Sequence, residues 1–251
     1  MSTPRGPVYD RIGVGYQARR RPEPAWQARL TAALGATPSV LNVGAGAGSY
    51  EPTDRLTVAV EPAATMIAQR PPGSAPVVRA VSEHLPMADR SFDTALAVLT
   101  LHHWTDPAAG LAELRRVARR QVLVTWDPAV TRTYWLMQEY LPEMAEWEAD
   151  LATLDTVVEH LDVQQVETLP VPANCVDGVM AAYWCRPAAY LDPSVRAAIS
   201  NLSLIDQDVV ARGLGHLEAD LADGSWAVRH ADLMDRDELE IGYRLVIAGE
   251  P

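Results

Sequence analysis

Five short apolar segments, separated by stretches with helical spacing, constrain the fold of this chain more than any other feature. The segments are residues 39–43, 56–60, 77–81, 94–101 and 121–126. Helical patterns lie between them at residues 62–69 and 107–119. Strands that are apolar throughout are typical of a parallel sheet covered by helices on both faces. We therefore expect an α/β fold with a doubly wound, mostly parallel sheet.

The pattern changes after residue 127, where helical stretches dominate. We expect helices at residues 131–160, 177–191 and 204–221, and strands near residues 163–171 and 240–248. Ligands of open α/β sheets bind beyond the carboxyl ends of the strands. The helices of the second half should therefore form a cap over a ligand site at that edge.

Composition excludes several kinds of chemistry. All 21 basic side chains are arginine, so neither a lysine Schiff base nor a P-loop lysine can form. The net charge is −12, and residues 133–168 hold nine carboxylates and no arginine. Because most of such a surface would repel a polyanion, we expect no nucleic-acid partner.

Two cysteines, Cys175 and Cys185, are the only ones in the chain. Their spacing suits neither a zinc site nor a disulfide scaffold, so we expect two buried thiols in a reducing compartment and no metal. We find no apolar signal core at the N-terminus and no run near the ~20 apolar residues that a membrane span requires. These features predict a cytoplasmic protein without a membrane partner.

The strongest local motif is a glycine loop at residues 44–48, directly after the first apolar strand. Glycine there permits positive φ and lets a ligand approach the backbone closely. The next strand ends in Glu61, whose carboxylate could bind the two hydroxyls of a ribose. Together they predict a nucleoside-containing cofactor. A dinucleotide loop would have glycine at Ser49, and the acidic Glu51 beside the loop suits a cationic ligand better than a pyrophosphate.

The chain resembles a class I S-adenosylmethionine-dependent methyltransferase of the small-molecule type, near the ubiquinone/menaquinone-methyltransferase-like group. Four ordered segments carry the resemblance: VLNVGAGAG at 40–48, VAVEP at 58–62, SEHLPMADRSFDTALAVLTLHHW at 82–104 and LAELRRVARRQVLVTW at 111–126. The N-terminal residues, with Tyr9, Tyr16 and the arginines before Pro22, are similar to the lid of that family. The resemblance covers about residues 8–127.

The resemblance implies a Rossmann-like sheet of seven strands and one structural domain with four parts. These are an N-terminal helical lid at 1–36, a cofactor-binding core at 37–128, a helical cap or substrate region at 129–238 with one core strand near 163–171, and a closing core strand at 239–251. It also implies methyl transfer from S-adenosylmethionine to an O, N or C atom of a small metabolite, with S-adenosylhomocysteine as the product.

The resemblance further implies which residues bind the cofactor. The set comprises Tyr9, Tyr16, Asn42, Gly44, Gly46, Gly48, Glu61, Pro62, Met66, Ser82, Glu83, Leu99 and Thr100. Two positions depart from the family pattern: Asn42 stands where an acid is common, and Val81 stands where the adenine strand commonly ends in an acid.

Two histidines follow the fourth strand, and either His102 or His103 could serve as a general base because imidazole titrates near neutral pH. The alternative is that both only pack and form hydrogen bonds. For the acceptor we expect an aromatic-walled pocket with a few polar groups. The candidate substrate-binding residues are Trp104, Trp126, Asp177, Tyr183 and Trp184. An aromatic stripe that packs the cap onto the sheet would give the same pattern.

Two other functions fit parts of the sequence. One is a Rossmann-type NAD(P)-dependent oxidoreductase, which the spacing of the glycine loop disfavours. The other is a non-catalytic cofactor-binding protein of the same fold. The sequence leaves open the methyl acceptor and the oligomeric state.

Overall fold

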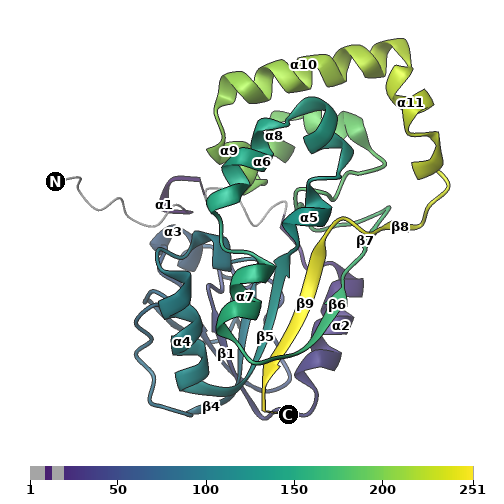
Figure 1. Cartoon of the computed structure of the whole chain (residues 1–251). Helices are drawn as coiled ribbons and strands as arrows, with labels where there is room; N and C mark the ends of the chain where they lie inside the picture. Colours follow the sequence, from purple (N-terminus) through teal and green to yellow (C-terminus); the bar gives the residue numbers. More distant parts are fainter. Residues whose placement is uncertain (1–8, 13–19, 251) are drawn as a thin grey trace.

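A twisted sheet of seven strands forms the centre of the computed structural model, which describes residues 9–12 and 20–250 (Figure 1). The strand order is β3-β2-β1-β4-β5-β9-β6. All neighbours from β3 to β5 pair in parallel, and β9 runs antiparallel to both β5 and β6. The predicted doubly wound, mostly parallel sheet is therefore confirmed.

The strands of this sheet are β1 (Ser39–Val43), β2 (Leu56–Val60), β3 (Val77–Val78), β4 (Phe92–Val98), β5 (Ala118–Trp126), β6 (Val163–Thr168) and β9 (Tyr243–Gly249). A separate pair consists of β7 (Val171–Pro172) and β8 (Glu238–Leu239). The predicted strands at 77–81, 94–101 and 163–171 are each longer than the observed ones. The last of them divides between the large sheet and the small pair.

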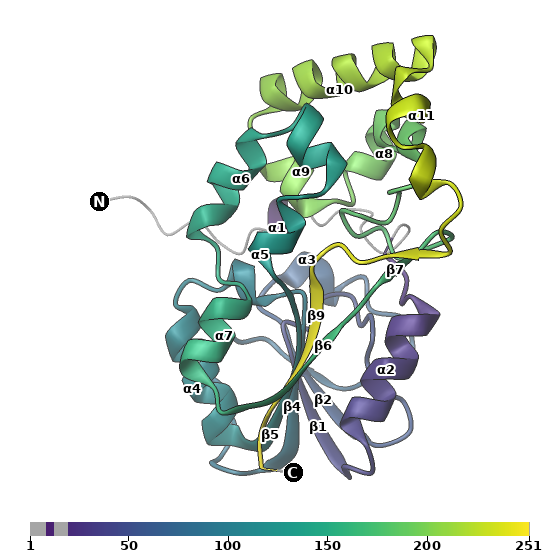
Figure 2. The ribbon, with the colours of Figure 1, turned by 45° about the vertical axis from the view of Figure 1, so that its right-hand side comes forward.

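Helices cover both faces of the large sheet (Figure 2). On one face α2 (Pro24–Leu34) packs Trp26 and Leu30 against Val40 of β1. On the other face α4 (Pro107–Val117) and α7 (Leu154–His160) pack with the next residue of β1, Leu41. Successive residues of a strand point to opposite faces, and helices bury both faces here. This explains why the strands read as unbroken apolar runs.

The cap lies above the carboxyl ends of the parallel strands, in the upper half of Figures 1 and 2. Its elements are α5 (Pro128–Thr131), η3 (Leu136–Tyr140), α6 (Glu143–Trp147), η4 (Glu148–Asp150), η5 (Pro187–Leu191), α8 (Pro193–Arg196), α9 (Ser200–Leu204), α10 (Gln207–Asp223), α11 (Ser225–Arg229) and η6 (Ala231–Leu233). Three further short elements lie near the carboxyl ends of the strands: α1 (Tyr9–Ile12), α3 (Ala64–Ile67) and η2 (Leu101–His103).

Two of the predicted helices are wrong in form. The stretch at 131–160 is divided into several short helices. Pro142 has no N–H to continue η3, and Thr153 caps a new helix. The stretch at 177–191 is a series of turns until η5 begins at Pro187. Long-range contacts hold that segment: the Trp184 indole donates to the Val171 carbonyl at 2.9 Å. The predicted helix at 204–221 corresponds to α10.

The N-terminal segment is described only in part. Tyr16, which the resemblance assigned to the cofactor, lies outside the described residues. In the part of the chain that the structure describes, every helix is too short or too polar to span a lipid bilayer.

Candidate active site

The glycine loop leaves β1 and turns under the end of β2. The Gly44 and Ala45 amides both donate to the Val60 carbonyl, at 2.9 and 3.0 Å. Gly44 has φ +69°, and a Cβ built on it would lie 2.0 Å from Thr100 Oγ1. Packing against β4 and the left-handed backbone therefore both require glycine at this position.

Glu61, at the end of β2, has both carboxylate oxygens bound to backbone amides. Gly46 N–H donates to Oε2 and Ala63 N–H to Oε1, both at 2.8 Å. The side chain is only 4% exposed, and this burial raises its pKa against the lowering effect of the two amides. Glu61 thus joins the glycine loop to the segment that leads into α3.

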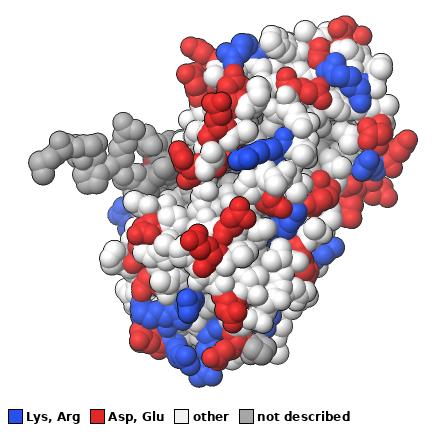
Figure 3. Space-filling view, viewed as in Figure 1, with Lys and Arg blue, Asp and Glu red and all other residues white. Residues whose placement is uncertain are grey.

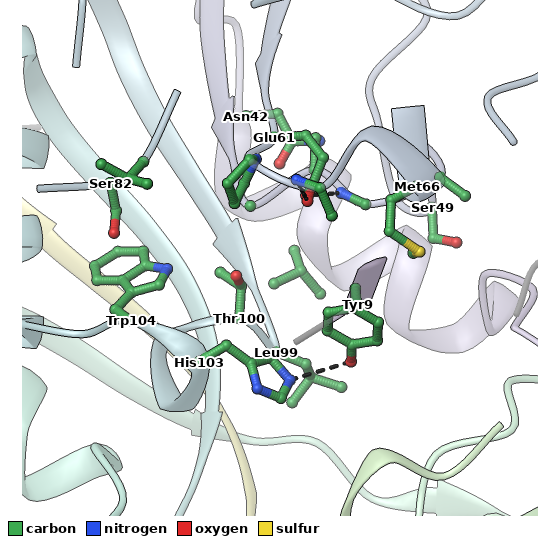
Figure 4. A pocket seen from close by; sticks show the side chains of 18 of the residues that line it. Tyr9, Asn42, Ser49, Glu61, Met66, Ser82, Leu99, Thr100, His103 and Trp104 are labelled. Atoms are coloured by element: carbon green, nitrogen blue, oxygen red, sulfur yellow. Dashed lines mark hydrogen bonds between the residues drawn. The ribbon is translucent and has the colours of Figure 1, made fainter. Parts of the chain in front are cut away.

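A cavity of about 320 Å³ opens at the carboxyl ends of β1, β2 and β4 (Figure 4). This volume falls in the usual range for small-ligand sites. Its wall includes eleven of the predicted cofactor residues: Tyr9, Asn42, Gly44, Gly46, Glu61, Pro62, Met66, Ser82, Glu83, Leu99 and Thr100. Gly48 does not line it, since a Cβ there would face Arg70 and Ser74. The predicted cofactor role of Gly48 stays a prediction.

One end of the cavity is built by Ser82, Glu83 and Trp104. Ser82 Oγ donates to Glu83 at 3.0 Å, and Glu83 also accepts the amides of Thr105 and Asp106 at 2.7 and 3.1 Å. Trp104 packs over Gly110, where a Cβ would lie 2.4 Å from its ring, and Figure 4 shows it beside Ser82. The structure thus places Trp104 in this cavity.

A buried ion pair that the sequence analysis did not foresee supports the glycine loop. Arg70 Nη2 lies 2.7 and 2.9 Å from the Glu51 oxygens, and each side chain is 5% exposed. Asn42 Nδ2 also donates to Glu51, at 3.3 Å. Arg70 therefore neutralises the acid that we had connected with a cationic ligand. The partners are 19 positions apart in the chain, a spacing that no motif marks.

The two histidines after β4 line different cavities. His103 lines the cofactor cavity, where its Nε2 lies 3.1 Å from the Tyr9 hydroxyl (Figure 4). Burial, aided by the nearby Arg20 charge, lowers the His103 pKa to about 4. Burial also lowers the His102 pKa well below its usual value. Both rings are therefore neutral near pH 7.

A second cavity, of about 60 Å³, lies between the ends of β4 and β5 and the cap. It shares Tyr9, Arg20 and Leu99 with the first cavity. Leu99 stands in this common wall at φ +49°, a strained backbone conformation for a leucine. His102 and Trp126 also line the second cavity.

Three predicted substrate residues lie outside both cavities. Trp184 is fully buried in the core, and Tyr183 packs edge-on against Tyr190 at 5.5 Å. Asp177 is 1% exposed and lies 2.5 Å from Arg20 Nε. It also accepts the Tyr50 hydroxyl at 2.8 Å. Its contacts tie Arg20 and Tyr50 to the cap. The substrate role of these three residues stays a prediction, and none of them lines either cavity.

The cap residues that do line the second cavity were missed by the sequence analysis. They include Glu148, Gly178, Val179, Met180, Ala181, Ile199, Ser200 and Asn201. From the segment around residue 180, the sequence suggested Asp177, Tyr183 and Trp184. The backbone and small side chains of that segment face the cavity instead.

The polar and apolar groups that line the first cavity match those of S-adenosylmethionine. Glu61 offers carboxylate oxygens at the end of β2, Pro62 and Met66 offer apolar surface, and the Ser82 hydroxyl lies at the far end. The glycine loop leaves the backbone accessible without a Cβ between it and the cavity.

Comparisons with known proteins agree with this architecture. Residues 41–124 match the model of the methyltransferase domain family. A candidate methyltransferase from an antibiotic biosynthesis pathway of Anabaena variabilis has 28% identity and a TM-score of 0.83, over 92% of this chain and 99% of that one. No match was found among curated proteins.

Two more distant structures share the fold. An S-adenosylmethionine-dependent methyltransferase of Thermotoga maritima has 21% identity and a TM-score of 0.52, over 64% of this chain and 84% of that one. Geranyl diphosphate C-methyltransferase of Streptomyces coelicolor, solved with S-adenosylhomocysteine, has 14% identity and a TM-score of 0.51, over 90% and 79%. These two structures show the shared fold alone, whereas the matched domain and the Anabaena variabilis structure support a class I S-adenosylmethionine-dependent methyltransferase.

Proposed function

We propose that this enzyme transfers the methyl group of S-adenosylmethionine to a small molecule whose reactive end enters the second cavity. The observation that carries the proposal is the common wall of the two cavities, formed by Tyr9, Arg20 and Leu99. We call the second cavity the acceptor cavity. A nucleophile bound there would meet the methyl donor where the two cavities adjoin. Cap residues line the second cavity, and its volume of about 60 Å³ favours a small acceptor over a macromolecule.

Particular residues would hold the cofactor in the first cavity. Glu61 would accept the ribose hydroxyls, Pro62 and Met66 would pack on the adenine, and Ser82 would lie at its edge. When bound, the cofactor supplies an electrophilic methyl group on a sulfonium. The chain then has to orient the nucleophile and exclude water, and orientation can contribute ~7–11 kcal/mol toward the barrier.

Either neutral histidine would take a proton from the acceptor if the reaction releases one. His102 faces the acceptor cavity directly, while His103 lies on the cofactor side with the Tyr9 hydroxyl. We assign the base to His102 because the proton leaves an atom in its cavity. A general base of this kind contributes about 10²–10⁴-fold to the rate.

The biological setting is proposed from similarity. The Anabaena variabilis relative is named for an antibiotic biosynthesis pathway, which supports a role for this enzyme in the biosynthesis of a small metabolite. The ubiquinone/menaquinone-like subgroup stays a prediction.

The test is incubation of the enzyme and a cell extract with cofactor labelled in its methyl group, followed by separation of the extract by molecular size. We expect the label in the small-molecule fraction. Label confined to protein or nucleic acid would overturn the small-molecule proposal.

A further inference from the structure

Glu148 is a buried carboxylate in the acceptor cavity with one oxygen unused. It begins η4 in the cap, lines the second cavity and is 3% exposed. Asn201 Nδ2 donates to Oε1 at 3.1 Å, while Oε2 is buried without a hydrogen-bond partner. A buried acceptor left unpaired is destabilising, and more so when it is charged. A ligand that donates to Oε2 would remove this cost.

The charge of Glu148 is also left without a direct counterion. Among the described residues, no basic side chain lies within ion-pairing distance of it. Arg20, the basic residue of the same cavity, is bound to Asp177, and Arg132 acts on Glu148 only through space. Burial raises the Glu148 pKa to about 7. A cation in the cavity would therefore supply the counterion that Glu148 lacks among the described residues.

The surroundings favour a cation as well. Glu143, Glu146 and Asp150 lie on α6 and η4 beside Glu148. On the face drawn in Figure 3, acidic side chains outnumber basic ones over the cap, whereas arginines gather at the opposite end of the sheet. The summed charge of the whole chain is −12. Such a field attracts positively charged small molecules.

Two more unpartnered polar atoms belong to residues of the same cavity: His102 Nδ1 and Trp126 Nε1. The cavity volume of about 60 Å³ is several times the ~10–15 Å³ that one water molecule needs. The cavity therefore admits the polar end of a ligand, and the rest of the ligand would lie near the wall that the two cavities share.

We propose that the methyl acceptor is a small amine whose nitrogen binds Glu148 Oε2 through an N–H donor. This inference rests on the proposed function, because it names the substrate class of that site. Asn201 positions the carboxylate by holding its other oxygen. An alcohol would satisfy Oε2 but not the uncompensated charge.

The chemistry balances with the residues present. For an amine acceptor, Glu148 takes the proton that His102 would take from other acceptors. An entering ammonium gives one proton to the Glu148 carboxylate, which frees the nitrogen lone pair. The nitrogen then forms the N–C bond while the S–C bond breaks and its electron pair stays on sulfur. The product is an N-methylammonium ion beside S-adenosylhomocysteine, and Glu148 returns its proton to solvent.

The experiment is calorimetric titration of protein saturated with S-adenosylhomocysteine, with two probes of equal length, n-propylamine and 1-propanol. At about pH 8 the amine is protonated and Glu148 is mostly ionised. We expect wild-type protein to bind the amine about tenfold or more tighter than the alcohol. Glu148→Gln should abolish that preference, while Glu146→Gln, which removes an exposed acid of α6, should retain it. Both variants should bind S-adenosylhomocysteine as wild type does.

Three results would overturn the amine assignment. They are equal or tighter binding of the alcohol by wild type, an amine preference that persists in Glu148→Gln, and no binding of either probe. None of these results would contradict the proposed function, because the labelled-cofactor experiment tests it separately. Label that enters small alcohols or carbon acids instead would also contradict the amine while supporting small-molecule transfer.

Discussion

Glu61 shows how one side chain serves both the loop and its ligand. Each of its oxygens already accepts a backbone N–H, from Gly46 and from Ala63. A carboxylate oxygen has two lone-pair sites, so capacity remains for ribose hydroxyls. The sequence predicted this carboxylate from its place at a strand end, but its two amide contacts depend on how the loop turns back and could not be predicted.

Glu61→Gln is expected to weaken S-adenosylhomocysteine binding about tenfold or more. The amide keeps the size of the side chain but replaces one acceptor oxygen by a donor, which opposes a backbone N–H and a ribose hydroxyl. Calorimetry on the variant and on Glu146→Gln, a matched change outside both cavities, measures the difference. Equal affinities in all three proteins would remove Glu61 from the cofactor site.

His103 gives the protein a defined sensitivity to acid. Its pKa is lowered to about 4 in the folded protein by burial and by the Arg20 charge, against about 6.5 in an unfolded chain. The unfolded state therefore binds more protons between these values, and stability is lost as pH falls through this window. We expect His103→Gln to gain up to about 3 kcal/mol relative to wild type between pH ~7 and ~4.

Urea unfolding of both proteins at the two pH values measures this gain. A free-energy difference between wild type and His103→Gln that is the same at both values would show that His103 does not titrate in this window.

At the scale of elements, the sequence predicted the parallel half of the molecule better than the cap. Strands that are apolar throughout and the glycine loop are local sequence patterns, and they predict β1, β2 and β4. The turns at 177–186 were predicted as part of a helix at 177–191. Contacts made with remote residues, such as the Asp177 pair with Arg20, determine the backbone there instead.

The contact of α4 with the cavity wall gives a test at this scale. Alanine normally stabilises a helix interior over glycine by up to ~1 kcal/mol. At Gly110 the added Cβ would lie 2.4 Å from the Trp104 ring and 3.2 Å from Ser82 Oγ, and such overpacking costs about 1–3 kcal/mol. We expect Gly110→Ala to lower the free energy of unfolding and to weaken S-adenosylhomocysteine binding.

Gly215→Ala is the matched control, because it lies within α10 and an added Cβ there meets no atom within 4 Å. This variant should be stabilised and should bind S-adenosylhomocysteine as wild type does. Stabilisation of both variants would show that Trp104 does not press on Gly110.

Across the whole molecule, the acceptor cavity forms where distant parts of the chain meet. Glu148 and Asn201 are 53 positions apart, and Arg20 and Asp177 are 157 apart. No spacing rule connects such pairs, so the sequence predicted that a cap would cover the site but not which residues would line it. Of the aromatic residues it favoured, Trp126 lines the acceptor cavity and Trp104 the cofactor cavity, whereas Tyr183 and Trp184 pack within the cap.

Filling the acceptor cavity tests the central claim most directly. Ala181 is 3% exposed and lines the cavity, so Ala181→Leu should occupy much of its volume of about 60 Å³. Ala188→Leu places the same side chain on the exposed face of η5. The measurement is the rate of labelled methyl transfer to small molecules, with S-adenosylhomocysteine affinity determined on the same samples. We predict that Ala181→Leu loses most transfer at unchanged affinity while Ala188→Leu keeps both; full transfer by Ala181→Leu would contradict the account.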